Sequence, residues 1–339
     1  MSVDASATAT AAPAIPGLAL RRFRGAEDFP AMVGVANASR AADGLRDVTR
    51  VEDLSRVYVS GNGFDPRQDV VIAEVRGEMV GYARGWWARE VGETYFYRQL
   101  GFVLPAWRRK GIGGELLRRL EHRQREIASA HADTGKLFNV YVTQPETGRA
   151  AMLEKAGYRP ARYLFSMVRP DLENIADFPL PPGVELRPVL PIHYRAVWDT
   201  DQEVFASHWG RQQAVEGDYE AWLASAEFQP RLWQVAWDVA ANRIAGQARP
   251  FVPDAANRES GRLRGYTEFI VVCDAWRRRG LARAVISHSL RALKNAGMTE
   301  SALEVDSENP CGATGVYEAC GFRVEQRNVV YRKPVADHG

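Results

Sequence analysis

Short apolar runs alternate along the chain with longer segments in which apolar residues recur every three or four positions. The runs Val70–Val75 and Phe269–Val272 are rich in β-branched residues, which favours buried strands. The segments that follow Gly113 and Ala282 have the spacing of helices with one apolar face. This alternation of strands and helices predicts an α/β fold (α+β, with a mixed sheet).

A basic turn joins the strand Phe269–Val272 to the helix after it. The turn reads Arg277, Arg278, Arg279, Gly280, Leu281, Ala282. The first N–H groups of a helix have no partner within the helix, and the helix dipole adds partial positive charge there. Gly280 and Ala282 leave room for a ligand, and arginine side chains suit phosphate oxygens. The turn therefore indicates an anion site, although a basic surface turn would have a similar composition.

The first half of the chain repeats this pattern. Residues 106–113 place Ala-Trp, a basic triplet and Gly-x-Gly before a helical segment, as residues 275–282 do with Gly-x-Ala. Gly81–Arg84 is also echoed by Gly246–Arg249, 165 residues later. Several landmarks in one order at one approximate period predict a duplicated domain.

We predict four segments from these patterns. Residues 1–16 are small, polar and free of a basic start, which favours a flexible tail over a signal peptide. Residues 17–170 form the N-terminal domain and residues 183–335 the C-terminal domain. Residues 171–182 form a linker, which ends in Pro181 and Pro182.

The two basic turns resemble the acyl-CoA pyrophosphate loop of the GNAT N-acetyltransferase superfamily, Arg/Gln-x-x-Gly-x-Gly/Ala after a central strand. The second half adds Leu303–Asn309 and the run Tyr317-Glu318-x-x-Gly321-Phe322, which are similar to the late strand and helix end of that superfamily. Two such domains in one chain most resemble tandem GNAT proteins of the mycothiol synthase type. The resemblance implies two tandem GNAT-fold domains that arose by internal duplication.

The resemblance also implies acetyl-CoA, or another acyl-CoA, as co-substrate, with no metal. The implied contacts of the second domain are Val271, Val272, Arg277, Arg278, Arg279, Gly280, Leu281, Ala282 and Asn309. Those of the first domain are Val103, Arg108, Arg109, Lys110, Gly111, Ile112 and Gly113. Backbone N–H groups near Val272 would polarise the thioester carbonyl.

Acyl transfer to an amine requires that the ammonium lose a proton, and the departing thiolate benefits from gaining one. Glu268, four residues before Val272, stands where the superfamily often has its base. Tyr317, before Gly321, stands where it often has its general acid. The alternatives are a half-exposed strand glutamate and a packed core tyrosine.

The first domain has Gln99 and Leu153 at these two positions. An amide cannot act as a base near neutral pH, and leucine has no proton to give. We therefore expect a catalytic second domain and a non-catalytic first domain, which either binds acyl-CoA or only packs.

The acceptor is expected to be a primary amine of a small molecule. In the superfamily, acceptor sites are built largely from the first helices and adjoining loops, which implies Phe205, His208 and Trp209 here. Core packing of Trp209 with a surface His208 is the alternative.

The length and composition of the chain limit the number of domains and the classes of binding partner that we expect. With 339 residues, two domains of ~150 residues each are expected. A net charge of +2 is too small to indicate nucleic acid or an anionic membrane as the partner. The three cysteines lack zinc or disulfide-framework spacing, and no apolar run reaches the ~20 residues that span a bilayer. We expect a cytoplasmic monomer or homodimer.

These observations predict an acyl-CoA-dependent N-acyltransferase that works by direct attack in a ternary complex. Two alternatives stay open. The protein could be a catalytically silent acyl-CoA-binding sensor or scaffold, or an aminoacyl-tRNA-dependent transferase on doubled GNAT domains.

Overall fold

The structure, a computed structural model, describes residues 13–45, 48–59, 63–90, 94–132, 134–206, 209, 214–215, 217–308 and 312–335, with the backbone alone at residue 259. Within these ranges the chain forms two compact units. The first holds residues 13–88, 94–159 and 331–335, and the second holds residues 89–90 and 160–330. Segments 160–170 and 331–335 are thus grouped differently from the domains predicted above. Most of the predicted tail, residues 1–12, lies outside the described residues.

The first unit is a mixed sheet with helices on both faces. Its strands are β1 (Leu18–Arg22), β2 (Val70–Val75), β3 (Glu78–Arg89), β4 (Tyr95–Val103) and β5 (Lys136–Thr143). Its helices are α1 (Phe29–Ala42), α2 (Val51–Val57), α3 (Pro66–Asp69), α4 (Ile112–Ser129) and α5 (Thr147–Lys155). The strands lie in the order β1-β2-β3-β4-β5. β4 pairs with β5 in parallel, and β2 pairs with its neighbours β1 and β3 in an antiparallel manner.

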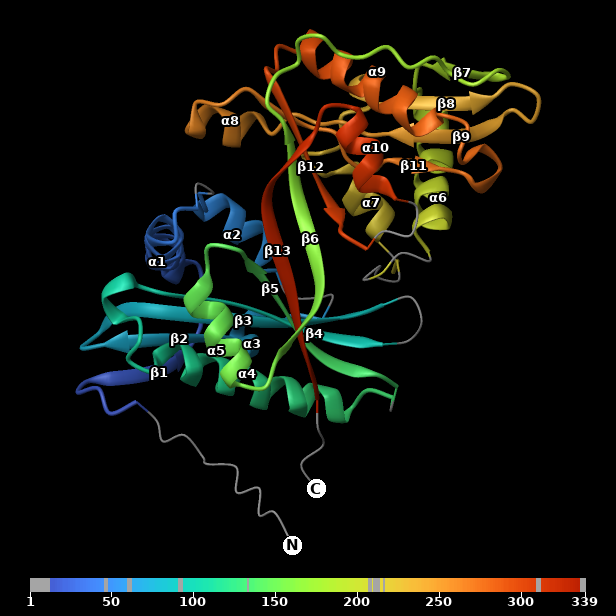
Figure 1. Ribbon diagram of the computed structural model, residues 1–339. Coiled ribbons are helices and arrows are strands. Elements are labelled where there is room, and N and C mark those ends of the chain that lie inside the picture. Colours follow the sequence, from blue (N-terminus) through green and yellow to red (C-terminus); the bar gives the residue numbers. More distant parts are fainter. Residues whose placement is uncertain are drawn as a thin grey trace, which may run out of the picture. The chain divides into compact units, whose positions relative to one another are not determined.

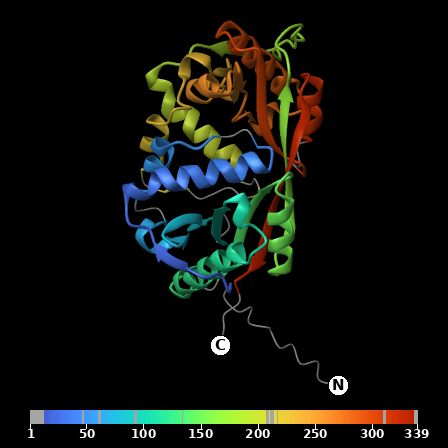
Figure 2. The same ribbon diagram turned by 90° about the vertical axis from the view of Figure 1, so that its left-hand side faces the viewer.

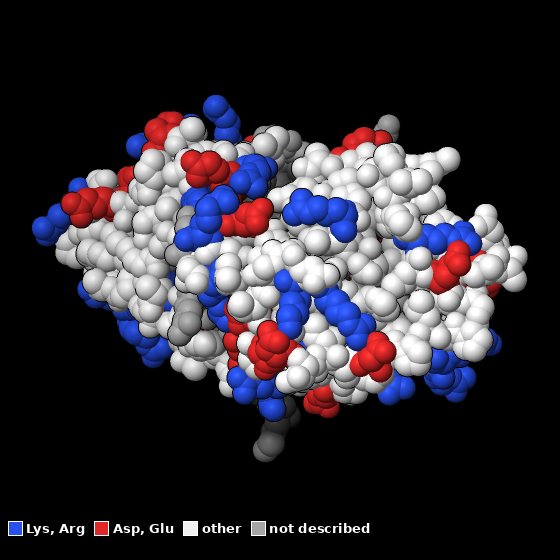
Figure 3. Space-filling view, turned by 90° about the horizontal axis from the view of Figure 1, so that it is seen from above, with Lys and Arg blue, Asp and Glu red and all other residues white. Residues whose placement is uncertain are grey.

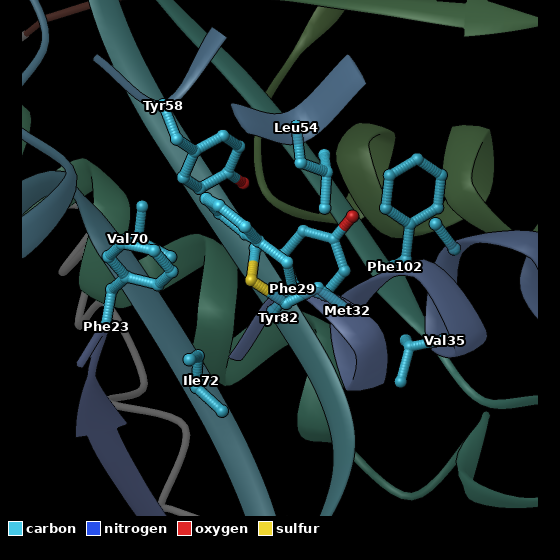
Figure 4. Packing of buried hydrophobic residues seen from close by; sticks show 11 residues of the cluster. Phe23, Phe29, Met32, Val35, Leu54, Tyr58, Val70, Ile72, Tyr82 and Phe102 are labelled. Carbon is cyan, nitrogen blue, oxygen red and sulfur yellow. The ribbon is translucent and has the colours of Figure 1, made fainter. Parts of the chain in front are cut away.

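Alternate residues of β2 face opposite sides of this sheet and bury against different helices. Val70 and Ile72 pack in a cluster with α1, whereas Val71 and Ala73 pack in a cluster with α4. Figures 1 and 2 show α1 (blue) and α4 (teal) on opposite faces of the sheet. Figure 4 shows the α1 side of the core, made of Phe23, Phe29, Met32, Val35, Leu54, Tyr58, Val70, Ile72, Tyr82 and Phe102.

The end of the chain completes the first unit. Strand β13 (Arg323–Pro334) follows β5 in the sheet order, and its residues from Tyr331 onward belong to this unit. The Tyr331 hydroxyl donates to Glu154 (2.9 Å), and the Lys333 ammonium lies 2.9 Å from a carboxylate oxygen of Glu121. These side-chain bonds explain why the last residues are grouped with a unit whose other residues precede them by more than 150 positions.

The second unit repeats the plan (Figure 1). Its strands are β6 (Arg159–Arg169), β7 (Val184–Arg187), β8 (Gln234–Asp238), β9 (Arg243–Ala248), β10 (Arg264–Tyr266), β11 (Val271–Val272), β12 (Glu300–Asp306) and most of β13. Its helices are α6 (Tyr194–Phe205), α7 (Asp218–Leu223), α8 (Asp254–Ser260), α9 (Leu281–Asn295) and α10 (Ala313–Ala319). Clusters on the two faces of β8 and β9 pack against α9 and α6, like the two clusters of the first unit.

The central strand of the second unit changes its hydrogen-bond partner part-way along. β10 pairs with β12 in parallel, but β11, five residues later, pairs with β9 in an antiparallel manner. Phe269 lies between them with φ of 51°. The expected strand Phe269–Val272 is therefore reduced to its last two residues, because the chain crosses from one set of strands to the other. The polar segment 254–265, which precedes this strand, contains α8 and the start of β10.

A network of buried hydroxyl groups secures the point where the two sets of strands separate. The Thr267 hydroxyl lies 3.0 Å from the Ser289 hydroxyl on α9 and 2.9 Å from the Ser301 hydroxyl on β12. The Thr267 N–H donates to the Ala302 carbonyl on β12 (2.9 Å). One residue thus links β12, α9 and the segment that leads to β11.

The surface carries mixed charge. On the face shown in Figure 3, Lys and Arg side chains are interspersed with Asp and Glu among uncharged residues. Among the described helices, none is both long and apolar enough to cross a lipid bilayer.

We expect Thr267→Val to lower the free energy of unfolding by about 1–3 kcal/mol, because two buried hydroxyl groups lose a partner. Thr299→Val is the matched control. Its side chain is exposed, so we expect a change within about 0.5 kcal/mol. Urea unfolding of both variants measures the difference. Equal effects of the two substitutions would contradict a structural role for the network.

Candidate functional site

A cavity of 1110 Å³ opens in the second unit where the central strand separates from β12. Its walls come from the segment Thr267–Val272, the basic turn with the start of α9, strand β12 and helix α10. The end of α6 closes another side through Val204 and Phe205. The change of strand partner therefore produces a cavity that reaches the first turn of α9.

The backbone of the basic turn exposes the start of α9. Arg278 and Gly280 both have positive φ angles, 59° and 86°, and Gly280 is the residue before the first helical position. No neighbouring heavy atom lies within 4 Å of the place where a Cβ of Gly280 would stand. The N–H groups at the start of the 15-residue helix α9 therefore face open space, as an anion site requires.

The three arginines of the turn have different surroundings. The Arg277 guanidinium donates to the Val272 carbonyl through Nε (3.3 Å) and pairs with Asp274 (2.9 Å). Arg277 and the exposed Arg278 line the cavity. The Arg279 guanidinium lies over the Trp276 ring, 5.0 Å from its centroid, and is not among the residues that line the cavity. The predicted contacts Val271, Val272, Gly280, Leu281 and Ala282 also line it.

Glu268 is half-buried in the wall of this cavity. The pKa of its carboxyl group is raised to about 7, mainly by burial and also by the negative charges of Glu304 and Glu227. The backbone N–H of Glu304 acts in the opposite direction by donating to the carboxylate. The side chain is thus a carboxylate that exchanges protons near neutral pH, as a general base requires.

Tyr317 lines the same cavity from helix α10. Its ring packs against the Phe322 ring in an edge-to-face manner, with 6.2 Å between the centroids. The structure therefore brings the two predicted catalytic residues, 49 positions apart in the sequence, into one cavity.

A backbone N–H of β11 also faces the gap. β11 is the edge strand of the four-stranded sheet β11-β9-β8-β7. The Cys273 N–H donates to the Ala245 carbonyl of β9 (3.0 Å), so the preceding N–H, that of Val272, points away from β9. The Val272 N–H is thereby directed toward the side on which the cavity lies.

The basic turn of the first unit has the same backbone conformation. Arg109 and Gly111 have φ angles of 60° and 87°, close to those of Arg278 and Gly280. Gly111 is exposed, however, and Cγ of Pro13 lies 3.2 Å from the place where its Cβ would stand. Arg108 is also engaged, since its guanidinium pairs with Asp43 (2.7 Å) and donates to Ser39.

The first unit also differs at the positions that correspond to the two predicted catalytic residues. Gln99 is buried, donates to Gln124 (2.8 Å) and accepts from the Tyr158 hydroxyl (3.0 Å). Leu153 is 1% exposed and belongs to the core. Both residues are therefore part of the buried interior of the first unit.

Of the residues predicted to bind the acceptor, Phe205 and Trp209 line the cavity. The Arg162 guanidinium lies 5.1 Å from the centroid of the Trp209 ring and pairs with Asp306 (2.9 Å), which also lines it. His208 and Asn309 lie outside the described residues.

Sequence reasoning missed one residue that the structure places beside Glu268. Glu304 lies on β12 between the buried residues Leu303 and Val305, and its own side chain is exposed in the cavity wall. An alternating strand pattern gives any exposed glutamate the appearance of a solvent-facing residue. The internal repeat was the signal available in the sequence. The first domain has Val140 at the place that corresponds to Glu304, so the carboxyl group is a feature of the second domain alone.

Comparisons with known proteins identify two GNAT regions in the chain. A model described as "Acetyltransferase (GNAT) domain" matches residues 66–160, and one described as "Acetyltransferase (GNAT) family" matches residues 194–322. A protein of Geodermatophilus obscurus named mycothiol acetyltransferase is 27% identical over 89% of this chain and 93% of its own length. A protein of that name from Thermobifida fusca is 28% identical over 90% of this chain and 94% of its own.

Solved structures give the same result. A GCN5-related N-acetyltransferase from Sphaerobacter thermophilus has a TM-score of 0.73 and 25% identity over 94% of this chain and 96% of that one. A tandem GNAT protein from the clavulanic acid biosynthesis pathway has a TM-score of 0.65 over 95% of this chain and 100% of that one. At 18% identity, the second likeness concerns the fold alone.

We expect Glu268→Gln to stabilise the protein relative to the wild type, increasingly so as the pH rises. A folded-state pKa of about 7, above the ordinary 4.5, means that the ionised carboxyl is disfavoured in the folded state. The contribution of the protonated Glu268 carboxyl to the free energy of unfolding of the wild type is therefore lost as the pH rises through the folded-state pKa. Between pH 5 and pH 8 the difference in unfolding free energy should grow by about 2 kcal/mol. Urea unfolding at the two pH values measures it, and a difference independent of pH would contradict the raised pKa.

Proposed function

Because the chain belongs to the GNAT acetyltransferase family, we propose that its second unit transfers the acetyl group of acetyl-CoA to a primary amine of a small molecule. The observation that carries this proposal is the shared cavity. Glu268, Tyr317 and the open start of α9 all border it.

The residues at the turn fit the charge of a CoA pyrophosphate. The start of α9 offers N–H groups and partial positive charge, and Arg277 and Arg278 add two guanidinium groups to the cavity wall. The open space beside Gly280 allows phosphate oxygens to approach the backbone. When bound, acetyl-CoA supplies the acetyl group as a thioester. In the first unit, by contrast, Cγ of Pro13 lies 3.2 Å from the place where a Cβ of Gly111 would stand.

Glu268 takes the proton that the acceptor must lose. Amines are protonated near neutral pH, and only the free amine can attack a carbonyl carbon. A carboxylate with a pKa of about 7 accepts this proton without being protonated in advance at slightly alkaline pH. Residue 268 holds the proton while the new C–N bond forms and the C–S bond breaks.

Tyr317 and Val272 act on the other two charges of the reaction. The Tyr317 hydroxyl, from helix α10, donates its proton to the departing thiolate sulfur. The Val272 N–H faces the gap and stabilises negative charge on the carbonyl oxygen.

The acceptor is proposed to enter beside the end of α6. Phe205 and Trp209 form an aromatic part of the cavity wall, and Asp306 adds a carboxylate. Relatives that cover nearly the whole chain are named mycothiol acetyltransferase, which supports a small hydrophilic amine as acceptor.

We expect Glu268→Gln and Tyr317→Phe each to lower kcat by about 10²–10³-fold, because each removes one proton transfer. Both substitutions keep the shape of the side chain, and Tyr317→Phe keeps the contact with Phe322. Release of the CoA thiol is followed with acetyl-CoA and a panel of primary amines that includes an aliphatic diamine, an aminosugar and an amino-acid amide.

The assignment of roles fails if both variants turn over at the wild-type rate. Gln124→Leu serves as a control in the first unit, since it disturbs the hydrogen bond to Gln99 but leaves the cavity of the second unit intact. We expect this control to lower stability without lowering kcat.

The matched pair Gly280→Glu and Gly111→Glu tests which unit binds acetyl-CoA. Both glycines have almost the same positive φ, so the backbone strain of the substitution, about 1–2 kcal/mol, is similar. We expect Gly280→Glu to abolish binding in isothermal titration, because a carboxylate would stand where phosphate oxygens approach. Gly111→Glu should keep wild-type affinity for acetyl-CoA.

Two binding sites in the wild type, each lost with its own glycine, would mean that the first unit also binds the ligand. Loss of binding in Gly111→Glu alone, with a folded protein, would reverse the assignment of the units.

A further inference from the structure

Glu304 stands directly across the gap from Glu268. β10 and β12 pair in parallel with Tyr266 opposite Ala302. Two residues further along each strand direction, the same register places Glu268 opposite Glu304. At this point β10 has ended and the cavity begins. The backbone N–H of Glu304 donates to the Glu268 carboxylate. The two carboxyl groups therefore border the same part of the cavity.

The side chain of Glu304 accepts a hydrogen bond from Asn328 on β13. The Asn328 amide, 1% exposed, donates to a carboxylate oxygen of Glu304 (3.4 Å) and to the Ser166 hydroxyl (2.9 Å). A buried amide that orients an exposed carboxylate limits its rotamers, which favours a defined contact over a solvated surface charge.

The charges around Glu268 are predominantly negative. Glu304 faces it from β12, and Glu227 faces it from the segment before the short helix Pro230–Leu232. Arg249 lies nearby, and its guanidinium pairs with the Asp201 carboxylate (2.7 Å). The backbone N–H of Arg249 donates to the Glu268 carbonyl. Neighbouring carboxylates repel one another, and a bound cation would relieve this repulsion. A protonated amine is such a cation.

The first unit provides an internal comparison. There β4 and β5 pair in parallel with Tyr97 opposite Phe138, as Tyr266 lies opposite Ala302. Two residues further on, the first unit has Gln99 and the buried Val140. The unit without the base thus also lacks the carboxylate opposite to it, so that Glu268 and Glu304 occur together and are absent together.

We propose that Glu304 binds the ammonium group of the acceptor and places it beside Glu268. The proposal rests on the proposed function and specifies the acceptor further, as an amine that enters the site in its protonated form. Glu304 receives no proton in this role. It holds the ammonium by charge, Glu268 takes the proton, and the neutral amine then attacks.

The test compares Glu304→Gln, Glu304→Asp and the wild type in steady-state kinetics. The substrates are acetyl-CoA and the most active amine of the panel described above. We expect Glu304→Gln to raise KM for the amine about tenfold, since one charge is lost from a partly exposed contact, and to leave KM for acetyl-CoA unchanged. Glu304→Asp, which keeps the charge, should recover most of the loss.

The pH profile gives a second readout that a merely structural residue would not move. Removing the Glu304 charge lowers the pKa of Glu268, so the acidic limb of kcat/KM should shift to lower pH in Glu304→Gln. Glu318→Gln is the control, because Glu318 is exposed on α10 and does not line the cavity. It should change neither KM nor the pH profile.

Three outcomes would overturn the proposal. Wild-type turnover with an unchanged amine KM in Glu304→Gln would refute the role of Glu304 and leave the proposed function intact. Equal increases of both KM values would mean a general distortion of the cavity. Absence of CoA release from the wild type with every amine of the panel would refute the proposed function together with this inference.

Discussion

The whole site depends on a change of hydrogen-bond partner in the central strand of the second unit. Up to Tyr266 the strand is bonded to β12, and from Val271 it is bonded to β9. Between these two residues the backbone has left β12 and has not yet reached β9, so the sheet separates at this point. The buried hydroxyl of Thr267 fastens the last point of contact with β12 to α9. Glu268, Phe269 and the start of α9 obtain their positions from this one crossing.

The duplicated units show what the crossing adds. Both have the same turn, with positive φ at Arg109 and Gly111 in one and at Arg278 and Gly280 in the other. In the first unit, the pairing of β4 with β5 also ends at Arg98, but β4 continues as one strand to Val103, and Gln99 forms hydrogen bonds inside the core. Pro13 also covers the glycine of its turn. The two units therefore share the conformation of the turn and differ in the surroundings of these residues.

Much of this was predictable from the sequence, because the turn and the candidate catalytic residues are local patterns. The basic triplet with its glycine, Glu268 before the apolar pair and Tyr317 before Gly321 follow from spacing and resemblance. The break in the strand was not predictable. The run Phe269–Val272 has the composition of a strand, and only the tertiary bonds of Thr267 show where pairing changes. Glu304 was hidden for a similar reason, since its neighbour across the gap lies 36 positions away in the sequence.

The most direct test of the central claim is amide hydrogen exchange of the full-length wild-type protein with and without acetyl-CoA. We expect slower exchange on ligand addition in residues 269–284, at the crossing and the first turn of α9, and no change in residues 103–115. Slower exchange in residues 103–115 alone would place the ligand in the first unit and contradict the account. Such a result would leave the cavity beside Glu268 without its donor.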